Sequence, residues 1–250
     1  EWQMKMGADA MVENKINKIA SEKTENKIDF KEKNIPEMPP NLNSDDLTFE
    51  NINIETTQKK IDECITLDQL KNLIQNFNGC ELKKTATQLV FSDGNPKSKV
   101  MLIGEAPGAE EDRQGSPFCG ASGQLLDKML NAIDLNRDSV YITNVIPWRP
   151  PGNRTPSDNE IKTMKPFLIK HIEIVMPKII VAVGGSAAKA LLNIEGGILR
   201  HRGTWKEFKL SSGKTIPIIA TLHPAYLLRA PNQKKLAWED LKLIRSKLND

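Results

Sequence analysis

The sequence predicts an α/β protein, a three-layer α/β/α sandwich with a central four-stranded parallel sheet. Four short apolar runs, rich in β-branched residues, occur at 100–103, 140–143, 179–183 and 216–220. Continuous apolar runs of this length are typical of strands that are covered on both faces. Helical stretches separate the runs, at 123–133, 157–174 and 186–192. Strands that alternate with helices favour crossover connections and therefore a parallel sheet.

A further helix is predicted before the first strand. It begins after Thr66, whose hydroxyl can cap a helix, and a stop is plausible at Gly79. Apolar residues within it follow helical spacing, at Leu67, Leu70, Leu73 and Ile74.

Charge divides the chain into two parts. Residues 1–65 carry a net charge of −5 and residues 66–250 a net charge of +8. We therefore expect an acidic, low-complexity and largely disordered extension over residues 1–60, and a folded domain over residues 61–250. The basic domain is a candidate to bind a polyanion, although a solvated charged surface would give the same composition.

Membrane and secretory classes are not favoured. No apolar run approaches the roughly 20 residues that span a bilayer. We also expect no secretory signal peptide at the N-terminus of the sequence. The three cysteines, Cys64, Cys80 and Cys119, are too few and too scattered for a disulfide scaffold. A cytoplasmic, reducing compartment is therefore expected.

Polar side chains follow the predicted strands at their carboxyl ends, where parallel sheets place ligands. Glu105 and Phe118 follow the first strand, Asn144 the second and His223 the fourth. Phe offers a face for stacking, Asn a donor and an acceptor, and His a donor for a carbonyl that gains negative charge. Together these residues could hold a flat heterocycle.

Three motifs lie on these strand ends, in the order GEAPGAEEDRQGSPFCG, ITNVIPWRPPGNRTP and HPAYLLR. On these motifs the chain resembles family 4 uracil-DNA glycosylases, the branch related to a phage DNA polymerase, from about residue 67 to about residue 244. The resemblance implies a monofunctional base excision repair enzyme that flips deoxyuridine out of DNA and hydrolyses its N-glycosidic bond. It would release uracil and leave an abasic site. We expect a monomer in the bacterial cytosol or nucleoid, with uracil-containing DNA as its substrate and DNA repair or replication proteins as candidate partners.

The resemblance also implies substrate-binding residues. Phe118 would stack on the flipped uracil, and Asn144 would pair with its N3–H and O4 edge. Gly104 and Ala106 belong to the same binding loop. Structural alternatives are a core role for Phe118 and a strand-end cap for Asn144.

The implied catalytic residues are His223, Glu105, Glu111 and Asn153. His223 would donate to uracil O2 as the uracil anion departs, since fixed donors placed where charge develops lower the barrier. Glu105 and Glu111 are candidates to orient water and stabilise the cationic sugar, and Asn153 to position water or the sugar–phosphate. The alternative for Glu105 is a carboxylate that holds backbone N–H groups.

The DNA contacts are expected from arginines, since all eight lie at or beyond Arg113. Those in or near the motif loops are Arg149, Arg154, Arg200, Arg202 and Arg229. Leu227 and Leu228 are candidates for a wedge that fills the gap left by the flipped base, with ordinary packing as the alternative.

One departure from the family concerns its cofactor, since many family 4 enzymes hold a [4Fe–4S] cluster with four cysteines. Only Cys80 is kept here, and the other three positions fall on Phe77, Trp148 and Met164. We therefore expect neither a cluster nor another metal, and instead an apolar plug formed by these three side chains.

Two other functions stay open. A non-catalytic nucleic-acid-binding or DNA polymerase-associated module could keep the fold after losing the cluster ligands. A nucleotide-processing enzyme is a third reading, although no complete phosphate-binding P-loop occurs. Gly108 stands where the better-known glycosylase family excludes thymine with a Tyr, so mismatch or analogue substrates also stay open.

Overall fold

Six strands form one sheet in the computed structural model of the chain, which describes residues 55–249. The strand order is β1-β3-β2-β4-β6-β5. The strands are β1 (Asp93–Gly94), β2 (Val100–Gly104), β3 (Tyr141–Asn144), β4 (Ile179–Val183), β5 (Trp205–Lys209) and β6 (Thr215–Thr221). The four inner strands pair in parallel, which confirms the predicted central sheet.

The antiparallel edge strands β1 and β5 complete the sheet and were not predicted. β1 has two residues only, which is too short for a periodic signal. β5 places charged residues between Trp205 and Phe208, and charged side chains are common on edge strands because they discourage further pairing.

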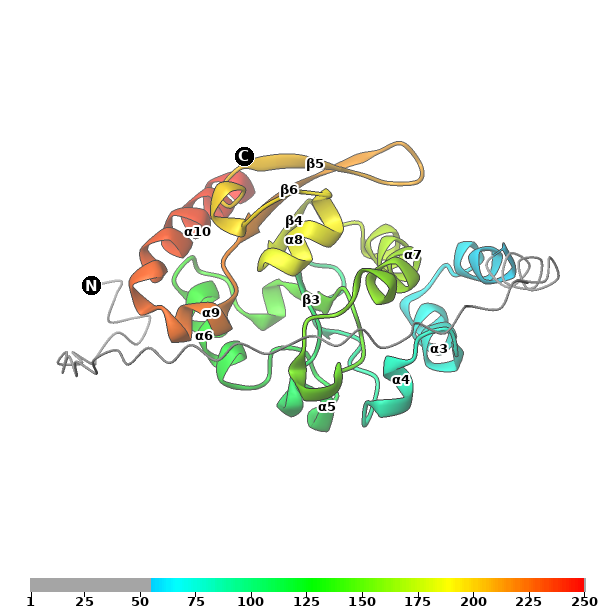
Figure 1. Cartoon of the computed structure of the whole chain (residues 1–250). Helices are drawn as coiled ribbons and strands as arrows, with labels where there is room; N and C mark the ends of the chain where they lie inside the picture. Colours follow the sequence, from blue (N-terminus) through cyan, green and yellow to red (C-terminus); the bar gives the residue numbers. More distant parts are fainter. Residues whose placement is uncertain (1–54, 250) are drawn as a thin grey trace, which may run out of the picture.

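Helices cover both faces of the sheet and complete the three layers (Figure 1). The α-helices are α3 (Leu67–Asn76), α4 (Leu82–Thr85), α5 (Ala109–Gln114), α6 (Ala121–Asn131), α7 (Asp158–Val175), α8 (Gly185–Leu192), α9 (Pro224–Arg229) and α10 (Lys234–Asn249). Short 3-10 turns are η1 (Arg137–Ser139), η2 (Pro151–Asn153), η3 (Ile198–Arg200) and η4 (Pro231–Gln233).

The strands alternate their side chains between two cores. Met101 and Ile103 of β2 pack with α3, α7 and α8, whereas Val100 and Leu102 pack with α6, α9 and α10. Strands β2, β3 and β4 are buried along their whole length and β6 is buried from Ile218 onward, so apolar residues are needed on both faces. This arrangement explains why the strands appear as continuous apolar runs.

The predicted helix before the first strand begins as expected and ends early. Thr66 caps α3 through a capping box with Gln69. The helix ends at Asn76, before Gly79, because the backbone adopts an extended conformation at Phe77. A Cβ on Gly79 would lie 2.3 Å from Cζ of Phe77, so the glycine makes room for that ring.

The predicted extension over residues 1–60 lies mostly outside the described residues. Within the described part, residues 55–62 are helical, and Ile61 and Cys64 pack into the core. Helical structure therefore begins before the predicted boundary at residue 61. Among the described residues, no helix has both the length and the apolar character to cross a membrane.

Candidate active site

A cavity of about 440 Å³ opens at the carboxyl ends of the parallel strands. Phe118, Asn144 and His223 all line it, although they come from three separate segments of the chain. The other lining residues are Glu105, Ala106, Pro107, Gly108, Glu111, Ser122, Pro150, Asn153, Arg154, Thr155, Ala225, Tyr226 and Arg229. The structure thus brings the predicted stacking, pairing and donor side chains to one site.

The ends of β2 and β3 build the floor of the cavity. The parallel register sets Gly104 directly beside Asn144. A Cβ on Gly104 would lie 2.3 Å from Oδ1 of Asn144 and 2.7 Å from Cζ of Phe118. Gly104 therefore lies beneath the cavity, where its lack of a side chain lets these two groups approach each other.

Asn144 is 6% exposed, and its carboxamide forms no hydrogen bond within residues 55–249. Among residues 55–249, no fully buried side-chain nitrogen or oxygen atom lacks a hydrogen-bond partner, so the carboxamide atoms of Asn144 are not fully buried and face the cavity that the residue lines. Its donor and acceptor are thus available to the cavity. This geometry does not match the alternative of a strand-end cap.

Phe118 sits in a constrained loop between α5 and α6. Its φ is +53°, in the left-handed region that bulky residues rarely adopt. Gly123 permits this path, because a Cβ there would lie 1.5 Å from the carbonyl oxygen of Phe118. Phe118 is 4% exposed, and its ring stacks against His223, with the ring centroids 5.5 Å apart.

His223 caps α9 and is held as a neutral imidazole. The backbone N–H of Ala225 donates to its Nδ1 at 3.1 Å, so Nδ1 is the acceptor and Nε2 carries the proton. Burial, reinforced by the charge of Arg229, lowers the pKa of His223 to about 4. His223 can therefore donate a hydrogen bond at neutral pH without carrying a charge.

The two carboxylates of the first loop have different surroundings. Glu111 accepts from the backbone N–H of Gly108 at 3.1 Å and from that of Gly120 at 3.4 Å. The Glu105 carboxylate forms no hydrogen bond within the described part of the chain and faces the cavity. The alternative role that the sequence left open for Glu105 was to hold backbone N–H groups. In the structure, Glu111 performs this role.

The PPGNR loop supplies the opposite wall. Asn153 has a φ of +55°, and its Oδ1 accepts from Nε of Arg149 at 2.7 Å. Arg154 donates to both carboxylate oxygens of Glu160, at 2.9 and 2.7 Å. This pair lowers the pKa of Glu160 to about 2, so Arg154 is already partly neutralised.

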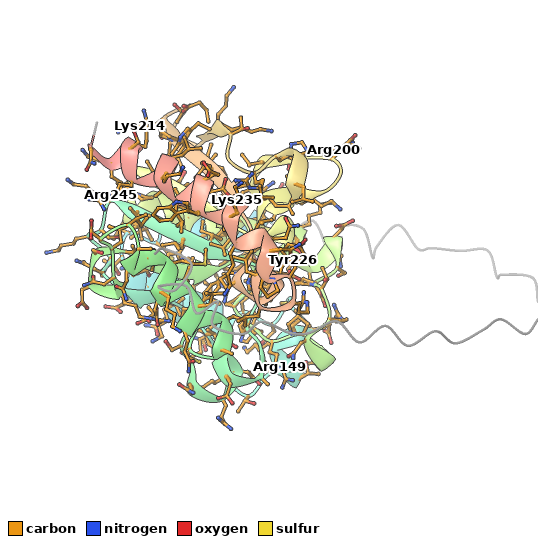
Figure 2. The ribbon with its side chains drawn as sticks, turned by 90° about the vertical axis from the view of Figure 1, so that its left-hand side faces the viewer. Arg149, Arg200, Lys214, Tyr226, Lys235 and Arg245 are labelled. Atoms are coloured by element: carbon orange, nitrogen blue, oxygen red, sulfur yellow. The ribbon has the colours of Figure 1, made fainter. Side chains whose placement is uncertain are left out.

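The predicted DNA contacts divide into exposed and buried residues. Arg200 and Arg229 are exposed, and Arg149 is half-buried. In Figure 2, Arg200 lies above Tyr226 and Arg149 below it, whereas Lys214 and Arg245 lie toward the opposite side of the view. Exposed cations near the mouth of a cavity suit phosphate oxygens.

Two of the predicted DNA contacts are internal. Arg202 forms a salt bridge with Asp240, whose side chain is fully buried, and also donates to the carbonyl of Leu236. Leu227 is 0% exposed and packs in the core, while its neighbour Leu228 is 45% exposed. Burial therefore excludes Leu227 as a wedge in this conformation and commits Arg202 to Asp240.

Sequence reasoning missed residues that shape the site without carrying a recognisable motif. Tyr226 and Ser122 line the cavity from α9 and α6. Arg137 donates to the carbonyl oxygens of Pro117 and Phe118 from outside the motif loops. Tyr226 could have been found, because it lies inside the HPAYLLR motif; Arg137 gave no such signal.

The positions of the family's cluster ligands lie in the apolar core. Cys80, Trp148 and Met164 are each at most 3% exposed and belong to one hydrophobic cluster, against which Phe77 packs. Burial raises the pKa of the Cys80 thiol, which disfavours the thiolate that iron requires. A single thiol among apolar side chains does not fit a four-thiolate cluster. In the described part of the chain, no group of three or more His, Cys, Asp or Glu could hold a metal ion.

Comparison with known proteins agrees with the fold and identifies the family. Residues 91–242 match the family described as the Uracil DNA glycosylase superfamily, and the chain belongs to this superfamily. Within it, a type-4 uracil-DNA glycosylase of Sulfurisphaera tokodaii is 40% identical over 72% of this chain and 84% of its own length. A type-4 uracil-DNA glycosylase of Archaeoglobus fulgidus is 38% identical over 72% of this chain and 92% of its own length. A DNA polymerase of Bacillus phage SP01 is 28% identical over 67% of this chain and 18% of the polymerase.

Proposed function

We propose that the chain is a monofunctional uracil-DNA glycosylase of base excision repair. It would flip deoxyuridine out of DNA, hydrolyse the N-glycosidic bond, release uracil and leave an abasic site. The observation that carries this proposal is that Phe118, Asn144 and His223 line one cavity at the strand ends. Its type-4 glycosylase relatives support the same activity.

Two side chains that line the cavity, Phe118 and Asn144, would recognise the base. The face of uracil would stack on Phe118. The Asn144 carboxamide would accept from N3–H and donate to O4. Cytosine presents the opposite polarity at both positions, so it would leave buried polar groups unpaired at a cost of about 1–3 kcal/mol each.

His223 would stabilise the base as it departs as an anion. With Nδ1 engaged by Ala225, the Nε2–H of His223 would donate to uracil O2. A neutral donor strengthens its bond as negative charge develops on that oxygen, and it need not transfer the proton. Glu105 would stabilise the cationic sugar and orient the attacking water.

Three further residues would support these steps. Glu111 would fix the loop that carries Gly108 and Gly120. Asn153, held by Arg149, would position water or the sugar–phosphate. Leu228, rather than Leu227, is the wedge in this proposal, because it is exposed on α9.

The DNA strand would be bound by arginines, namely Arg154 and Arg229, which line the cavity, together with Arg149 and Arg200. Arg154 would have to share its guanidinium with Glu160. We further propose that the protein acts as a monomer and in the cytoplasm; its three free cysteines support a reducing compartment. DNA repair or replication proteins are proposed partners.

The protein is proposed to act without the family's iron–sulfur cluster. Only Cys80 of the four ligand positions is a cysteine, and Phe77, Trp148 and Met164 supply hydrocarbon in place of thiolates. Packing of these side chains would then join the same segments that the metal joins in related enzymes.

A uracil-containing oligonucleotide, incubated with the protein and then treated with alkali, tests the proposal directly. Strand breaks are expected with the wild-type chain. They should be lost in His223→Ala and Asn144→Ala variants that still bind DNA. Binding without strand breaks in the wild-type chain would instead favour a non-catalytic nucleic-acid-binding module.

A further inference from the structure

We infer that Arg137 is a positioning residue that fixes the Phe118 loop in the conformation that receives the base. This inference rests on the proposed function, since it assigns Phe118 as the stacking side chain. Arg137 lies outside the cavity and acts through the backbone of that loop. It therefore differs from the residues that would touch the uracil.

The guanidinium of Arg137 joins three separate segments of the fold. From η1 it donates to Asp127 Oδ1 on α6 at 2.9 Å and to the Asp93 carboxylate on β1. It also donates to the carbonyl oxygen of Pro117 at 3.3 Å and to that of Phe118. The arginine side chain is 27% exposed, so these bonds are partly shielded from water.

The loop needs such a contact because its backbone is unfavourable. Phe118 has a φ of +53°, and a bulky residue persists there only when its surroundings hold it. Arg137 binds the carbonyl oxygen of that same residue, which fixes the peptide plane that follows the ring. The ring is thereby held against His223 and above Gly104.

Only a planar guanidinium group can donate hydrogen bonds to all of these acceptors at once. Arginine presents five N–H donors in fixed directions, whereas lysine has one compact ammonium group. An ammonium at this position could pair with one of the two carboxylates but could not also reach both carbonyl oxygens. Arg137→Lys therefore keeps the positive charge but removes the fixed directions of the N–H donors.

The test compares Arg137→Lys with Arg245→Lys, the matched control. Arg245 also forms an ion pair, with Asp134, but it makes no contact with the Phe118 loop. Each change is made in the wild-type chain and in a Phe118→Ala background. The readouts are the single-turnover excision rate, the Kd for uracil-containing duplex, and hydrogen exchange of the amides from Phe118 to Gly120.

Arg137→Lys is expected to slow excision by about ten- to a hundredfold, with DNA affinity little changed, because misplaced contact groups raise the barrier. Exchange of the loop amides should become faster, and Arg245→Lys should alter neither readout. In the Phe118→Ala background, Arg137→Lys should cause little further loss, because the ring through which it acts is absent.

Several results would overturn the inference. An equal loss in both backgrounds would mean a general structural role, and unchanged loop exchange would mean that Arg137 does not hold the loop. Should Arg137→Lys not fold, Asp93→Asn replaces it, since it loosens the guanidinium while leaving the arginine in place. A wild-type chain without excision would refute the proposed function, whereas loop exchange would still decide the role of Arg137.

Discussion

The ring of Phe118 stacks on the imidazole of His223, with centroids 5.5 Å apart and planes inclined by 27°. The side chain proposed to bind the base and the one proposed to stabilise its departure are therefore in contact with each other. This contact restricts the rotamers of both side chains. Preorganised groups of this kind need little rearrangement during the reaction.

His223 should act as a neutral donor throughout the physiological pH range. The pKa of His223 is lowered to about 4. When the pH is lowered from 8 to 5, the single-turnover excision rate should therefore show no decrease centred near pH 6.5. His223→Ala should lower the rate by about 10²–10³-fold, the loss typical when one such donor is removed.

The control for His223 is His201→Ala, since His201 bonds to the Glu195 carbonyl and does not line the cavity. That variant should keep the wild-type rate. A titration near pH 6.5 that disappears in His223→Ala would contradict the neutral assignment.

Gly104→Ala should inactivate the site while leaving the fold in place. The added methyl would lie 2.3 Å from Oδ1 of Asn144 and 2.7 Å from Cζ of Phe118, so both groups must move. The excision rate should fall by about a hundredfold, as misplaced contact groups predict. Gly197→Ala is the matched control, because a Cβ there meets no atom within 4 Å.

Asn144→Asp tests recognition of the uracil edge. The substitution keeps the shape and the acceptor but removes the donor to O4 and adds negative charge. The value of kcat/KM for uracil excision should fall by a factor equivalent to about 1–3 kcal/mol. Asn72→Asp, the same change on the exposed surface of α3, should have no effect. Equal activity of the two variants would refute the pairing role of Asn144.

Iron should not accompany the activity. Protein purified without oxygen should contain no stoichiometric iron, and Cys80→Ser should keep its excision activity. Trp148→Ala should lower the free energy of unfolding by about 3–5 kcal/mol, because it empties a fully packed site. Elemental analysis and urea denaturation measure these outcomes, and a stoichiometric cluster that Cys80→Ser abolishes would contradict them.

Acid should destabilise the fold through His171, which is buried, and His223, which is half-buried. Burial lowers the pKa of His171 to about 3 and that of His223 to about 4, from an ordinary 6.5. Below pH 6.5 the unfolded chain binds protons at these residues that the folded chain does not, so stability falls as the pH falls. Each such proton contributes a slope of at most about 1.4 kcal/mol per pH unit.

His171→Gln isolates one of these protons. Urea midpoints measured between pH 6.5 and 4.5 should show a shallower loss of stability in the variant than in the wild-type chain. The difference should approach one bound proton. Equal slopes would mean that His171 is protonated within the fold.

The sequence predicts the four inner strands and the site side chains because each carries a local signal. Apolar runs such as 179–183 reflect burial on both faces, and Phe118, Asn144 and His223 stand in long motifs at the strand ends. Parallel topology then requires these ends to meet. The structure places all three around one cavity.

Other features depend on partners that are distant in sequence. Arg202 is an arginine near motif loops, yet its pairing with Asp240 exists only once α10 packs on the sheet. Leu227 and Leu228 are identical in type, and only the orientation of α9 makes one buried and the other exposed. Arg137 likewise acquires its four acceptors from β1, α6 and a loop. Neither spacing nor residue type encodes such contacts.

The hydrocarbon that occupies the ligand positions of the family's cluster has a consequence for how the protein is made. Packing of Trp148 and Met164 requires no delivery of metal and no protection of thiolates from air. The polypeptide should regain its native state from urea in aerated buffer with a chelator present, reaching the same yield as under nitrogen. If the protein acts without the cluster, as proposed, a cell short of iron would lose none of it to incomplete maturation.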